Sequence, residues 1–206
     1  MTSTSSPLLR RTVRVAVPAV AALTLTMAFA GPAAADPSFV SRAGGVVSFA
    51  ALPGETNTVT FLNLGSVFRV TDTTANLTAG PGCTQVDIHT VNCGSSTNVT
   101  RIQAALGNQN DIAENKTNAP ADIDGGAGED QLTGGGGNDR LTDPDGWNGP
   151  TLITTTFDGG GGNDTIVSRN GGFDRIACGA GFDIVVADNA SLDFLATSHS
   201  CDFVIR

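Results

Sequence analysis

The sequence predicts an all-β protein in which a parallel β-roll (a right-handed β-solenoid) follows a β-rich N-terminal cap. Three observations carry this prediction: a tandem repeat rich in Gly and Asp in the second half, an aliphatic residue at a fixed offset after each repeat Asp, and short alternating apolar runs in the first half. Asp and Gly are poor helix formers, so the second half is expected to consist of turns and very short strands.

Residues 1–35 have the organisation of a secretory signal peptide. Three arginines between positions 10 and 14 supply positive charge, residues 15–30 are apolar, and Ala33–Ala35 form an A-x-A cleavage site. A membrane anchor is the alternative, but this run is short for a span of about 20 residues and contains Pro18. We therefore expect a secreted, extracellular protein without a membrane span after cleavage. The sequence leaves open whether export uses the Sec or the twin-arginine route.

Segment 36–106 is expected to form short strands. Its runs VVSFA, TVTFL, SVFRV and VTRIQAAL alternate apolar and polar residues and are separated by turn signals such as Pro53-Gly54. Ile102, Ala104 and Leu106 carry this alternation into the turn that follows. The segment is either a β cap that covers the open end of the repeat region or a separate binding domain.

The four cysteines, Cys83, Cys93, Cys178 and Cys201, are expected to form two disulfides because an exported chain folds under oxidising conditions. Three pairings are possible. We favour Cys83 with Cys93, which closes a small hairpin, and Cys178 with Cys201, since each pair lies within one structural segment.

Segment 107–187 contains a nine-residue repeat. Three copies are nearly identical: GGAGEDQLT from Gly125, GGGGNDRLT from Gly134 and GGGGNDTIV from Gly159. Weaker copies start at Arg169 and Cys178. In every copy an Asp precedes an aliphatic residue by two positions, and the offset continues beyond the glycines: Asp130 with Leu132, Asp139 with Leu141, Asp164 with Ile166, Asp174 with Ile176, Asp183 with Val185, Asp193 with Leu195 and Asp202 with Val204.

Each copy is expected to form a six-residue turn and a three-residue strand whose middle residue points inward. One copy turns the chain by half a circuit, so two copies complete one coil and copies two apart stack on the same edge. Asp164 then lies above Asp183 and Asp202 on one edge, and Asp174 lies above Asp193 on the other.

Stacked carboxylates point to calcium. At the roughly 4.8 Å spacing of neighbouring strands, ionised Asp side chains repel one another unless a cation lies between them. Calcium takes about six to eight oxygen ligands, which Asp side chains and the carbonyls of glycine-rich turns can supply. A metal-free solenoid and a disordered acidic linker are the alternatives, and the inward aliphatic residue kept in every copy argues against disorder.

Residues 125–185 resemble the haemolysin-type (RTX) calcium-binding nonapeptide repeats, in an arrangement similar to small secreted proteins of high-GC Gram-positive bacteria. The tandem G-G-x-G-x-D-x-U-x pattern carries this resemblance. It implies a parallel β-roll that holds calcium between same-edge turns through sixth-position Asp side chains and turn carbonyls. The implied metal residues are Asp130, Asp139, Asp164, Asp174, Asp183 and, from a degenerate turn, Asp111, together with the turn positions Gly125, Ala127, Gly134, Gly136, Gly159 and Gly161.

Departures from the pattern limit the expected number of Ca²⁺ ions to three or four. Residues 143–157, which include Trp147, interrupt the repeat and are expected to form an inserted loop. Arg and Asn replace two glycines before Asp174, which weakens the expectation of a full site there. The degenerate turn LGNQND ends at Asp111, 19 residues before Asp130, and is expected to share calcium with the first good copy.

The last segment, 188–206, keeps the inward positions Leu195 and Val204 but has no glycines. It is therefore expected to be a C-terminal cap turn that extends the core without binding metal. The proposed Cys178–Cys201 disulfide would fasten this cap to the last calcium turn.

Composition excludes several function classes. The chain has 20 Asp+Glu against 11 Lys+Arg, and its single lysine leaves no basic patch for nucleic acid. Only His89 and His199 could serve acid–base chemistry, and no G-x-S-x-G elbow is present, so we expect no enzyme activity.

We therefore expect a monomeric, secreted calcium-binding protein with a structural role in the extracellular space or envelope. An adhesion or partner-binding module that uses the roll as a rigid spacer is the alternative, and a small secreted hydrolase is a weaker one. The sequence does not identify a protein or cell-wall partner.

Overall fold

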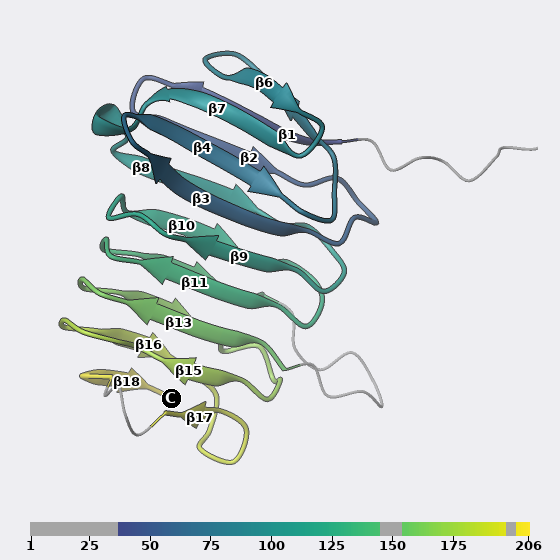
Figure 1. The fold of residues 1–206 in the computed structure, drawn as a ribbon. Helices are drawn as coiled ribbons and strands as arrows, with labels where there is room; N and C mark the ends of the chain where they lie inside the picture. Colours follow the sequence, from purple (N-terminus) through teal and green to yellow (C-terminus); the bar gives the residue numbers. More distant parts are fainter. Residues whose placement is uncertain (1–36, 145–153, 197–200) are drawn as a thin grey trace, which may run out of the picture. The chain divides into compact units, whose positions relative to one another are not determined.

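The computed structural model of the chain describes residues 37–144, 154–196 and 201–206. These residues form an all-β structure of two mixed sheets with nine strands each, which Figure 1 shows as two layers. None of the helices found in these ranges is long and apolar enough to cross a membrane. The expected signal peptide, residues 1–35, lies outside the described residues.

Sheet A has the strand order β18-β16-β14-β12-β10-β8-β2-β1-β5. Its strands are β1 (Ser38–Ala43), β2 (Val46–Ala50), β5 (Leu77–Ala79), β8 (Arg101–Ala105), β10 (Ala121–Asp124), β12 (Arg140–Thr142), β14 (Thr165–Val167), β16 (Ile184–Val186) and β18 (Phe203–Ile205).

Sheet B has the strand order β17-β15-β13-β11-β9-β3-β4-β7-β6. Its strands are β3 (Thr58–Leu64), β4 (Val67–Asp72), β6 (Thr84–Asp87), β7 (Thr90–Ser95), β9 (Ile112–Asn115), β11 (Gln131–Gly135), β13 (Thr156–Gly160), β15 (Arg175–Ala177) and β17 (Phe194–Leu195).

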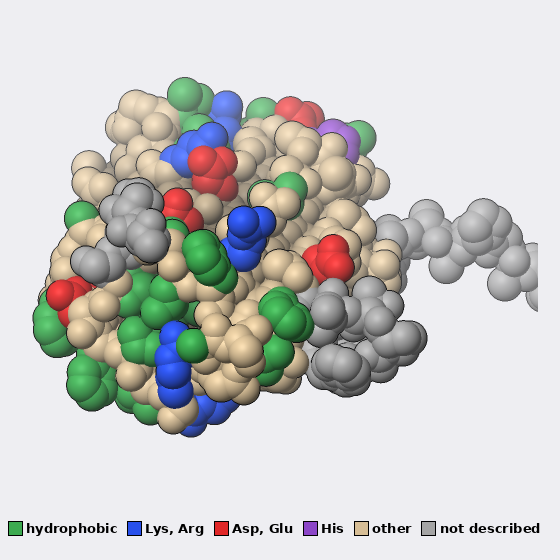
Figure 2. All heavy atoms as spheres, turned by 90° about the horizontal axis from the view of Figure 1, so that it is seen from below, with side chains coloured by type: hydrophobic (Ala, Val, Ile, Leu, Met, Phe, Trp, Pro, Cys, Tyr) green, Lys and Arg blue, Asp and Glu red, His purple; other side chains and the backbone are tan. Residues whose placement is uncertain are grey.

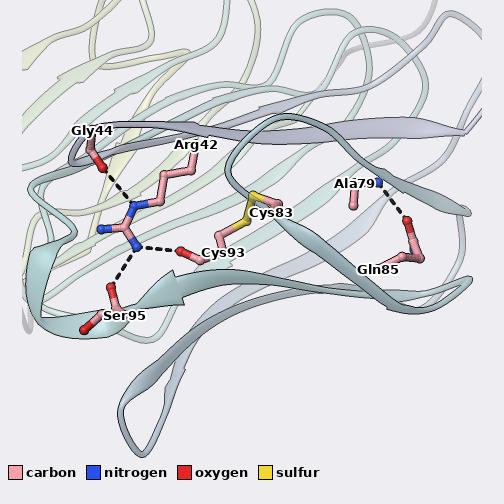
Figure 3. Close-up of a disulfide and its surroundings, with 7 residues drawn as sticks. All are labelled: Arg42, Gly44, Ala79, Cys83, Gln85, Cys93 and Ser95. Carbon is pink, nitrogen blue, oxygen red and sulfur yellow. Dashed lines mark hydrogen bonds between the residues drawn. A yellow bond between two sulfur atoms is a disulfide. The ribbon is translucent and has the colours of Figure 1, made fainter.

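Antiparallel pairs occur only in the N-terminal part of the described chain, where β1 pairs with β2, β3 with β4, β4 with β7, and β6 with β7. The predicted hairpin is confirmed, since a Cys83–Cys93 disulfide links β7 to the residue just before β6. The guanidinium of Arg42 on β1 donates to the carbonyl oxygens of Gly44, Cys93 and Ser95 beside this disulfide (Figure 3).

From β8 onward, consecutive strands alternate between the two sheets and every pairing is parallel. In sheet A, Leu141 pairs with Ile123 and Ile166. In sheet B, Leu132 pairs with Phe157, which in turn pairs with Ile176. Ile166 pairs with Val185, which belongs to the copy two positions further along, so the prediction that copies two apart stack on the same edge is confirmed.

The inward aliphatic residues predicted from the repeat form the core between the two sheets. Leu132, Leu141, Ile166, Ile176 and Val185 are buried. Phe157 joins this row although the sequence pattern placed it in the inserted loop; β13 begins at Thr156, before the expected end of the insertion. The central part of that insertion, residues 145–153 with Trp147, lies outside the described residues.

The parallel pattern also reaches into the N-terminal part. Strand β2 pairs in parallel with β8 in sheet A, and β3 pairs in parallel with β9 in sheet B. Residues 46–64 therefore follow the same path between the sheets as β8 and β9 do. Within this layer, Phe49 on β2 and Phe61 on β3 pack edge to face with their ring centroids 6.3 Å apart.

Candidate metal centre

The turns that join the two sheets form two rows. The turns 106–111, 125–130, 168–174 and 187–193 lead from sheet A to sheet B, and we call their row edge one. The turns 116–120, 136–139, 161–164 and 178–183 lead back from sheet B to sheet A, and we call their row edge two. Each repeat Asp is the last residue of its turn, so the parallel register brings the Asp side chains of one edge into a column.

On edge two the aspartates form a continuous hydrogen-bonded ladder. The backbone N–H of Ala121 donates to Asp139 Oδ1 at 2.6 Å, that of Asp139 to Asp164 Oδ1 at 2.8 Å, and that of Asp164 to Asp183 Oδ1 at 2.9 Å. Finally, Asp183 N–H donates to Asp202 Oδ2 at 2.9 Å. One carboxylate oxygen of each residue is thus used to hold the preceding layer.

Edge one has the same ladder. Asn57 N–H donates to Asp111 Oδ1 at 2.7 Å, and Asp111 N–H donates to Asp130 Oδ1 at 2.8 Å. Thr155 replaces an aspartate in the next layer: Asp130 N–H donates to Thr155 Oγ1 at 3.2 Å, and Thr155 N–H donates to Asp174 Oδ1 at 2.9 Å. The two ladders together include all six predicted aspartates. Asp111, Asp130 and Asp174 lie on edge one, and Asp139, Asp164 and Asp183 lie on edge two.

The second carboxylate oxygen has a different environment. The Oδ2 atoms of Asp111, Asp139, Asp164, Asp174 and Asp183 are buried and have no hydrogen-bond partner among the described residues. A buried acceptor without a partner costs roughly 1–3 kcal/mol, and more when it is charged. Binding of a proton or a cation to such an oxygen therefore lowers its free energy.

Glycines keep a space open beside these oxygens. A Cβ atom built on Gly134 would lie 2.5 Å from Asp139 Oδ2 and 2.6 Å from the Gly159 carbonyl oxygen. A Cβ atom built on Gly159 would lie 2.5 Å from Asp164 Oδ2 and would overlap the Cys178 carbonyl oxygen. A carboxylate and a main-chain carbonyl of the next layer thus face the same space beside each glycine.

Burial changes the acidity of the ladder. The pKa of Asp139 and Asp174 is raised to about 7, mainly by burial and also by the charges of Asp164 and Asp193, respectively, against the lowering effect of the backbone hydrogen bonds. Burial likewise raises the pKa of Asp164 to about 6, and it raises the pKa of Asp193. Without a cation, the carboxyl groups of Asp139 and Asp174 are therefore partly protonated near neutral pH.

The carboxylates are spread along the edges and do not meet in one cluster. No group of three or more His, Cys, Asp or Glu side chains that could hold a metal ion occurs in the part of the chain that the structure describes. A cation on either edge would therefore need main-chain oxygens in addition to Asp. The donor set of carboxylate plus carbonyl is one that suits calcium.

The predicted turn positions divide into two sets. Gly125, Gly134 and Gly159 are first positions, and a Cβ atom on each would meet Oδ2 of the Asp that ends its own turn. The third positions stack against the neighbouring turn through their N–H groups: Ala127 donates to Gly107 O at 2.9 Å, Gly136 to Thr117 O at 2.9 Å, and Gly161 to Gly135 O at 2.8 Å.

The sequence reasoning missed a second ladder, formed by the residue before the repeat Asp. Glu129 N–H donates to Asn110 Oδ1 at 3.1 Å, and Asn163 N–H donates to Asn138 Oδ1 at 2.8 Å. Phe182 N–H donates to Asn163 Oδ1 at 3.0 Å. The recurring Asn-Asp pair in the sequence was the available signal.

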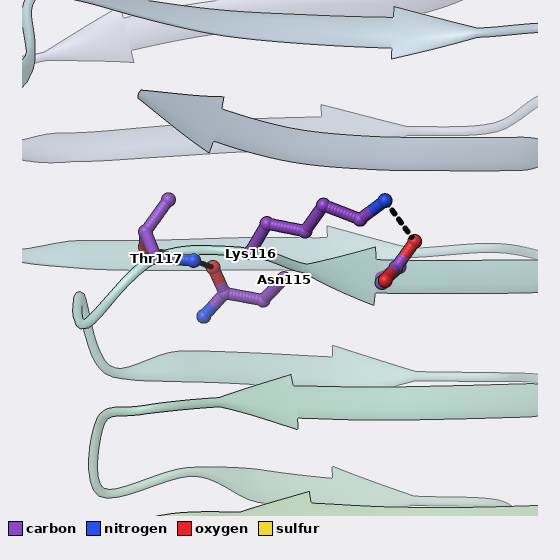
Figure 4. A network of polar contacts seen from close by, with 4 residues as sticks. Asn115, Lys116 and Thr117 are labelled. Atoms are coloured by element: carbon purple, nitrogen blue, oxygen red, sulfur yellow. Dashed lines mark hydrogen bonds and ion pairs between the residues drawn. The ribbon is translucent and has the colours of Figure 1, made fainter. Parts of the chain in front are cut away.

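The uppermost turn of edge two is closed without Asp or Gly. Asn115 Oδ1 accepts hydrogen bonds from Thr117 N–H at 2.9 Å and from Thr117 Oγ1 at 2.8 Å (Figure 4). Beside it, Lys116 forms an ion pair with Glu114 at 2.9 Å. This turn is closed by the hydrogen bonds of an uncharged Asx turn. On edge two, the first turn that ends in a repeat Asp is therefore the next one, which ends at Asp139.

The C-terminal disulfide and one histidine can be placed. Cys178 and Cys201 are bonded, which confirms the second predicted pairing. His89 Nδ1 lies 2.9 Å from the Ala75 carbonyl oxygen. His199 and Trp147 lie outside the described residues.

Large apolar side chains are exposed near the last strands. Phe182, Phe194 and Phe203 are each more than half exposed. Figure 2 shows hydrophobic side chains gathered on the face of the molecule seen from below. On the N-terminal strands, Leu64 and Val86 are exposed to a similar extent.

Comparisons with known proteins do not assign the chain. A scan against protein-family models, a search of curated proteins and a search of solved structures each gave no match.

Proposed function

We propose that this chain is a secreted calcium-binding protein of the RTX type, whose Gly-Asp turns fold around Ca²⁺ held between neighbouring layers of a parallel β-roll. In this proposal, residues 107–187 form the calcium-binding roll, 36–106 its N-terminal cap and 188–206 its C-terminal cap. The role is structural, outside the cell or in its envelope.

One observation supports this function above the others. On edge two, the buried Oδ2 atoms of Asp139 and Asp164 have no hydrogen-bond partner among the described residues, and each faces a space that only a glycine leaves open, next to a carbonyl oxygen of the adjoining layer. Hard oxygen donors of both kinds are the ligands that calcium prefers. When bound, calcium would supply the positive charge that the column of carboxylates lacks.

The ladder explains why such an ion would act on folding and not on a substrate. Each aspartate already holds the preceding layer through Oδ1, so a cation at Oδ2 would fix the carboxylate in its ionised form and join two layers. With a dissociation constant of about 0.1 mM and about 1 mM free calcium, each ion contributes roughly 1.4 kcal/mol to stability. Three or four ions would contribute about 4–6 kcal/mol, which is comparable to the stability of a small domain.

The test compares thermal unfolding in calcium, in magnesium and in chelator. We expect calcium to raise the melting temperature and magnesium to have little effect, because magnesium dehydrates reluctantly and demands a smaller, octahedral site. Asp164→Asn keeps an oxygen for the Asp139 N–H but removes the charge, so the calcium-induced shift should shrink. Asp122→Asn is the matched control, since Asp122 is an exposed strand residue outside the ladder, 4.0 Å from Arg140.

Equal melting temperatures in calcium and chelator would refute calcium-dependent folding. An Asp164→Asn protein with the full calcium response would show that this edge does not hold the ion.

A partner-binding module is the second candidate, favoured by the exposed phenylalanines near the last strands. Phe194 on β17 is 59% and Phe203 on β18 55% exposed, and Figure 2 shows hydrophobic side chains gathered on the face seen from below; large exposed apolar patches mark sites of protein interaction. If this face binds a partner, the folded chain should bind a hydrophobic dye there, and Phe194→Ser with Phe203→Ser should abolish the dye signal without lowering calcium uptake. A folded chain that binds no dye would remove this candidate.

A further inference from the structure

The N-terminal part contributes a turn of its own to edge one. Residues 52–57 join β2 to β3 in the way that 106–111 join β8 to β9. Ile112 N–H donates to the Asn57 carbonyl oxygen at 2.9 Å, as Gln131 N–H donates to that of Asp111 at 2.9 Å. Gly54 N–H also donates to Asn108 Oδ1 at 2.8 Å. Asn57 therefore occupies, in the layer before, the position that Asp111 occupies in the ladder.

The side chain of Asn57 is fully buried and its orientation is fixed. Its Nδ2 group donates to Ser38 Oγ at 3.0 Å and to Asp72 Oδ2 at 2.9 Å. Its Oδ1 atom is buried and has no hydrogen-bond partner among the described residues. The backbone N–H of Asn57 is bonded to Asp111 Oδ1, so the two residues are neighbours across the two turns, and Asp111 Oδ2 is also buried with no hydrogen-bond partner among the described residues.

Negative charge surrounds these two oxygens. Glu55 and Asp72 are both buried; Glu55 Oε2 accepts from Ser38 Oγ at 2.7 Å, and Asp72 Oδ1 accepts from Thr58 N–H at 3.1 Å. Burial, and then the charges of Asp130, Asp72 and Glu55, raise the pKa of Asp111 to about 7 against the lowering effect of the Asn57 N–H. The ion pairs found in the described part of the chain lie elsewhere, at Lys116 and Arg140.

The turn 106–111 differs from the glycine turns in a way that decides where a cation could lie. Leu106 occupies the first position, which is Gly in the turns starting at Gly125, Gly134 and Gly159. Its side chain is buried, so the space beside the first glycine is not available in this turn. A second side-chain oxygen for a cation at Asp111 must therefore come from an adjoining turn, and turn 52–57 offers the buried Asn57 Oδ1.

We propose that a hard divalent cation, calcium in the extracellular setting, binds between turns 52–57 and 106–111, with Asn57 Oδ1 and Asp111 Oδ2 as its side-chain ligands. Glu55 and Asp72 supply further negative charge without giving up their hydrogen bonds. This site rests on the proposed calcium function of the repeats and extends it to the N-terminal cap. Its consequence is that cap and repeat region are joined by metal as well as by strand pairing.

The experiment is calcium titration of the full mature chain by calorimetry, with the melting temperature measured in calcium and in chelator. Asn57→Ala should bind one ion fewer than the wild type and show a smaller calcium-induced shift. Asn57→Asp should bind the same number of ions as the wild type, with the affinity of one site raised on the order of tenfold, because ligand charge tunes calcium affinity. Asn63→Ala is the matched control and should match the wild type, since Asn63 is an exposed asparagine on β3, the strand that follows Asn57.

The outcomes separate this site from the repeat sites. If the wild type binds calcium and Asn57→Ala binds just as many ions with an unchanged shift, the junction site is wrong and the repeat sites stand. If Asn57→Ala does not fold, Asn57→Asp decides, and a calcium affinity equal to that of the wild type overturns the site. Loss of an ion in Asn63→Ala as well would overturn it, since the effect would not be specific to Asn57. A wild type that binds no calcium overturns both proposals.

Discussion

The two halves of the described chain bury different kinds of side chain. Strands β1 to β8 enclose the aromatic rings of Phe49, Phe61 and Phe68, whereas β9 to β16 bury small or medium apolar residues, apart from Phe157, and one carboxylate for most turns. The first half also buries two carboxylates, those of Glu55 and Asp72. Burying a phenylalanine contributes roughly 1.5–3 kcal/mol, but burying an uncompensated carboxylate opposes folding. The first half can therefore be stable through its core, while the second half depends on what neutralises its aspartates.

The largest expected effect is the response to calcium removal, and apart from the junction at Asn57 it should be confined to the second half. Chelation removes about 1.4 kcal/mol per ion under the conditions given above. Hydrogen exchange followed by mass spectrometry should show amides in β11 to β16 losing protection in chelator, while amides in β3, β4 and β7 stay protected. Equal loss of protection in both halves would show that they respond to calcium as one unit.

The pH dependence sharpens the same comparison. Asp111, Asp139 and Asp174 have a pKa near 7 in the folded chain, well above the ordinary value of 3.8. Between pH 3.8 and about pH 7 the folded state therefore binds more protons than the unfolded state. The stability that these protonated carboxyl groups contribute is lost as the pH rises through about 7. In chelator, the melting temperature should be higher at pH 5 than at pH 8.

Calcium should reverse that trend, because the ion binds the ionised carboxylates and competes with protons. The gain in melting temperature on adding calcium should therefore grow between pH 5 and pH 8. A calcium-free protein that becomes more stable over this interval would contradict the assignment of buried, uncompensated carboxylates.

A pair of glycine substitutions compares the turns of the two halves. Gly44, in the turn between β1 and β2, has a φ of +58°, and a Cβ atom there would meet no other atom within 4 Å, so Gly44→Ala should cost about 1 kcal/mol from backbone strain alone. Gly162, in a stacked repeat turn, has a φ of +107°, and a Cβ atom there would overlap the Gly137 carbonyl oxygen. Gly162→Ala should therefore cost about 3 kcal/mol or more.

Chemical denaturation of both variants in saturating calcium measures this difference. Equal costs for the two substitutions would mean that the repeat turns are not stacked as closely as the structure has them.

The smallest effect concerns the degenerate turn. Gln109 has a φ of 89°, in the region that favours glycine, and it occupies the position of Gly128, Gly162 and Gly181 in other turns. Relieving this strain with Gln109→Gly should gain about 0.5–1 kcal/mol after the entropy cost of glycine. A destabilised variant in equilibrium denaturation would indicate that the Gln109 side chain holds the turn in another way.

Much of the second half could be predicted from the sequence because its information is local. The offset from Asp to an aliphatic residue sets strand, turn and burial within nine residues, and the spacing of the copies sets which turns stack. This is why the burial of Leu132 and Ile166, and the shared edge of Asp164 and Asp183, followed from the pattern alone.

The rest depends on contacts between distant residues. Asn57 lies 54 residues before Asp111, in a turn with no repeat signature, and only strand pairing brings the two together. Thr155 occupies the position of an aspartate in the ladder. It does so because the strand that follows the inserted sequence pairs with β11 again in the register of the repeat. No periodicity marks either residue, so neither could be found before the register of the sheets was known.

The most direct test of the central claim is an anomalous difference map from crystals grown in calcium. We expect peaks on both edges between adjoining turns, including one between turns 136–139 and 161–164, at about 2.3–2.6 Å from carboxylate and carbonyl oxygens. Well-measured data that show only water or hydrogen-bonded protons beside Asp139 and Asp164, with calcium present in excess, would contradict the account.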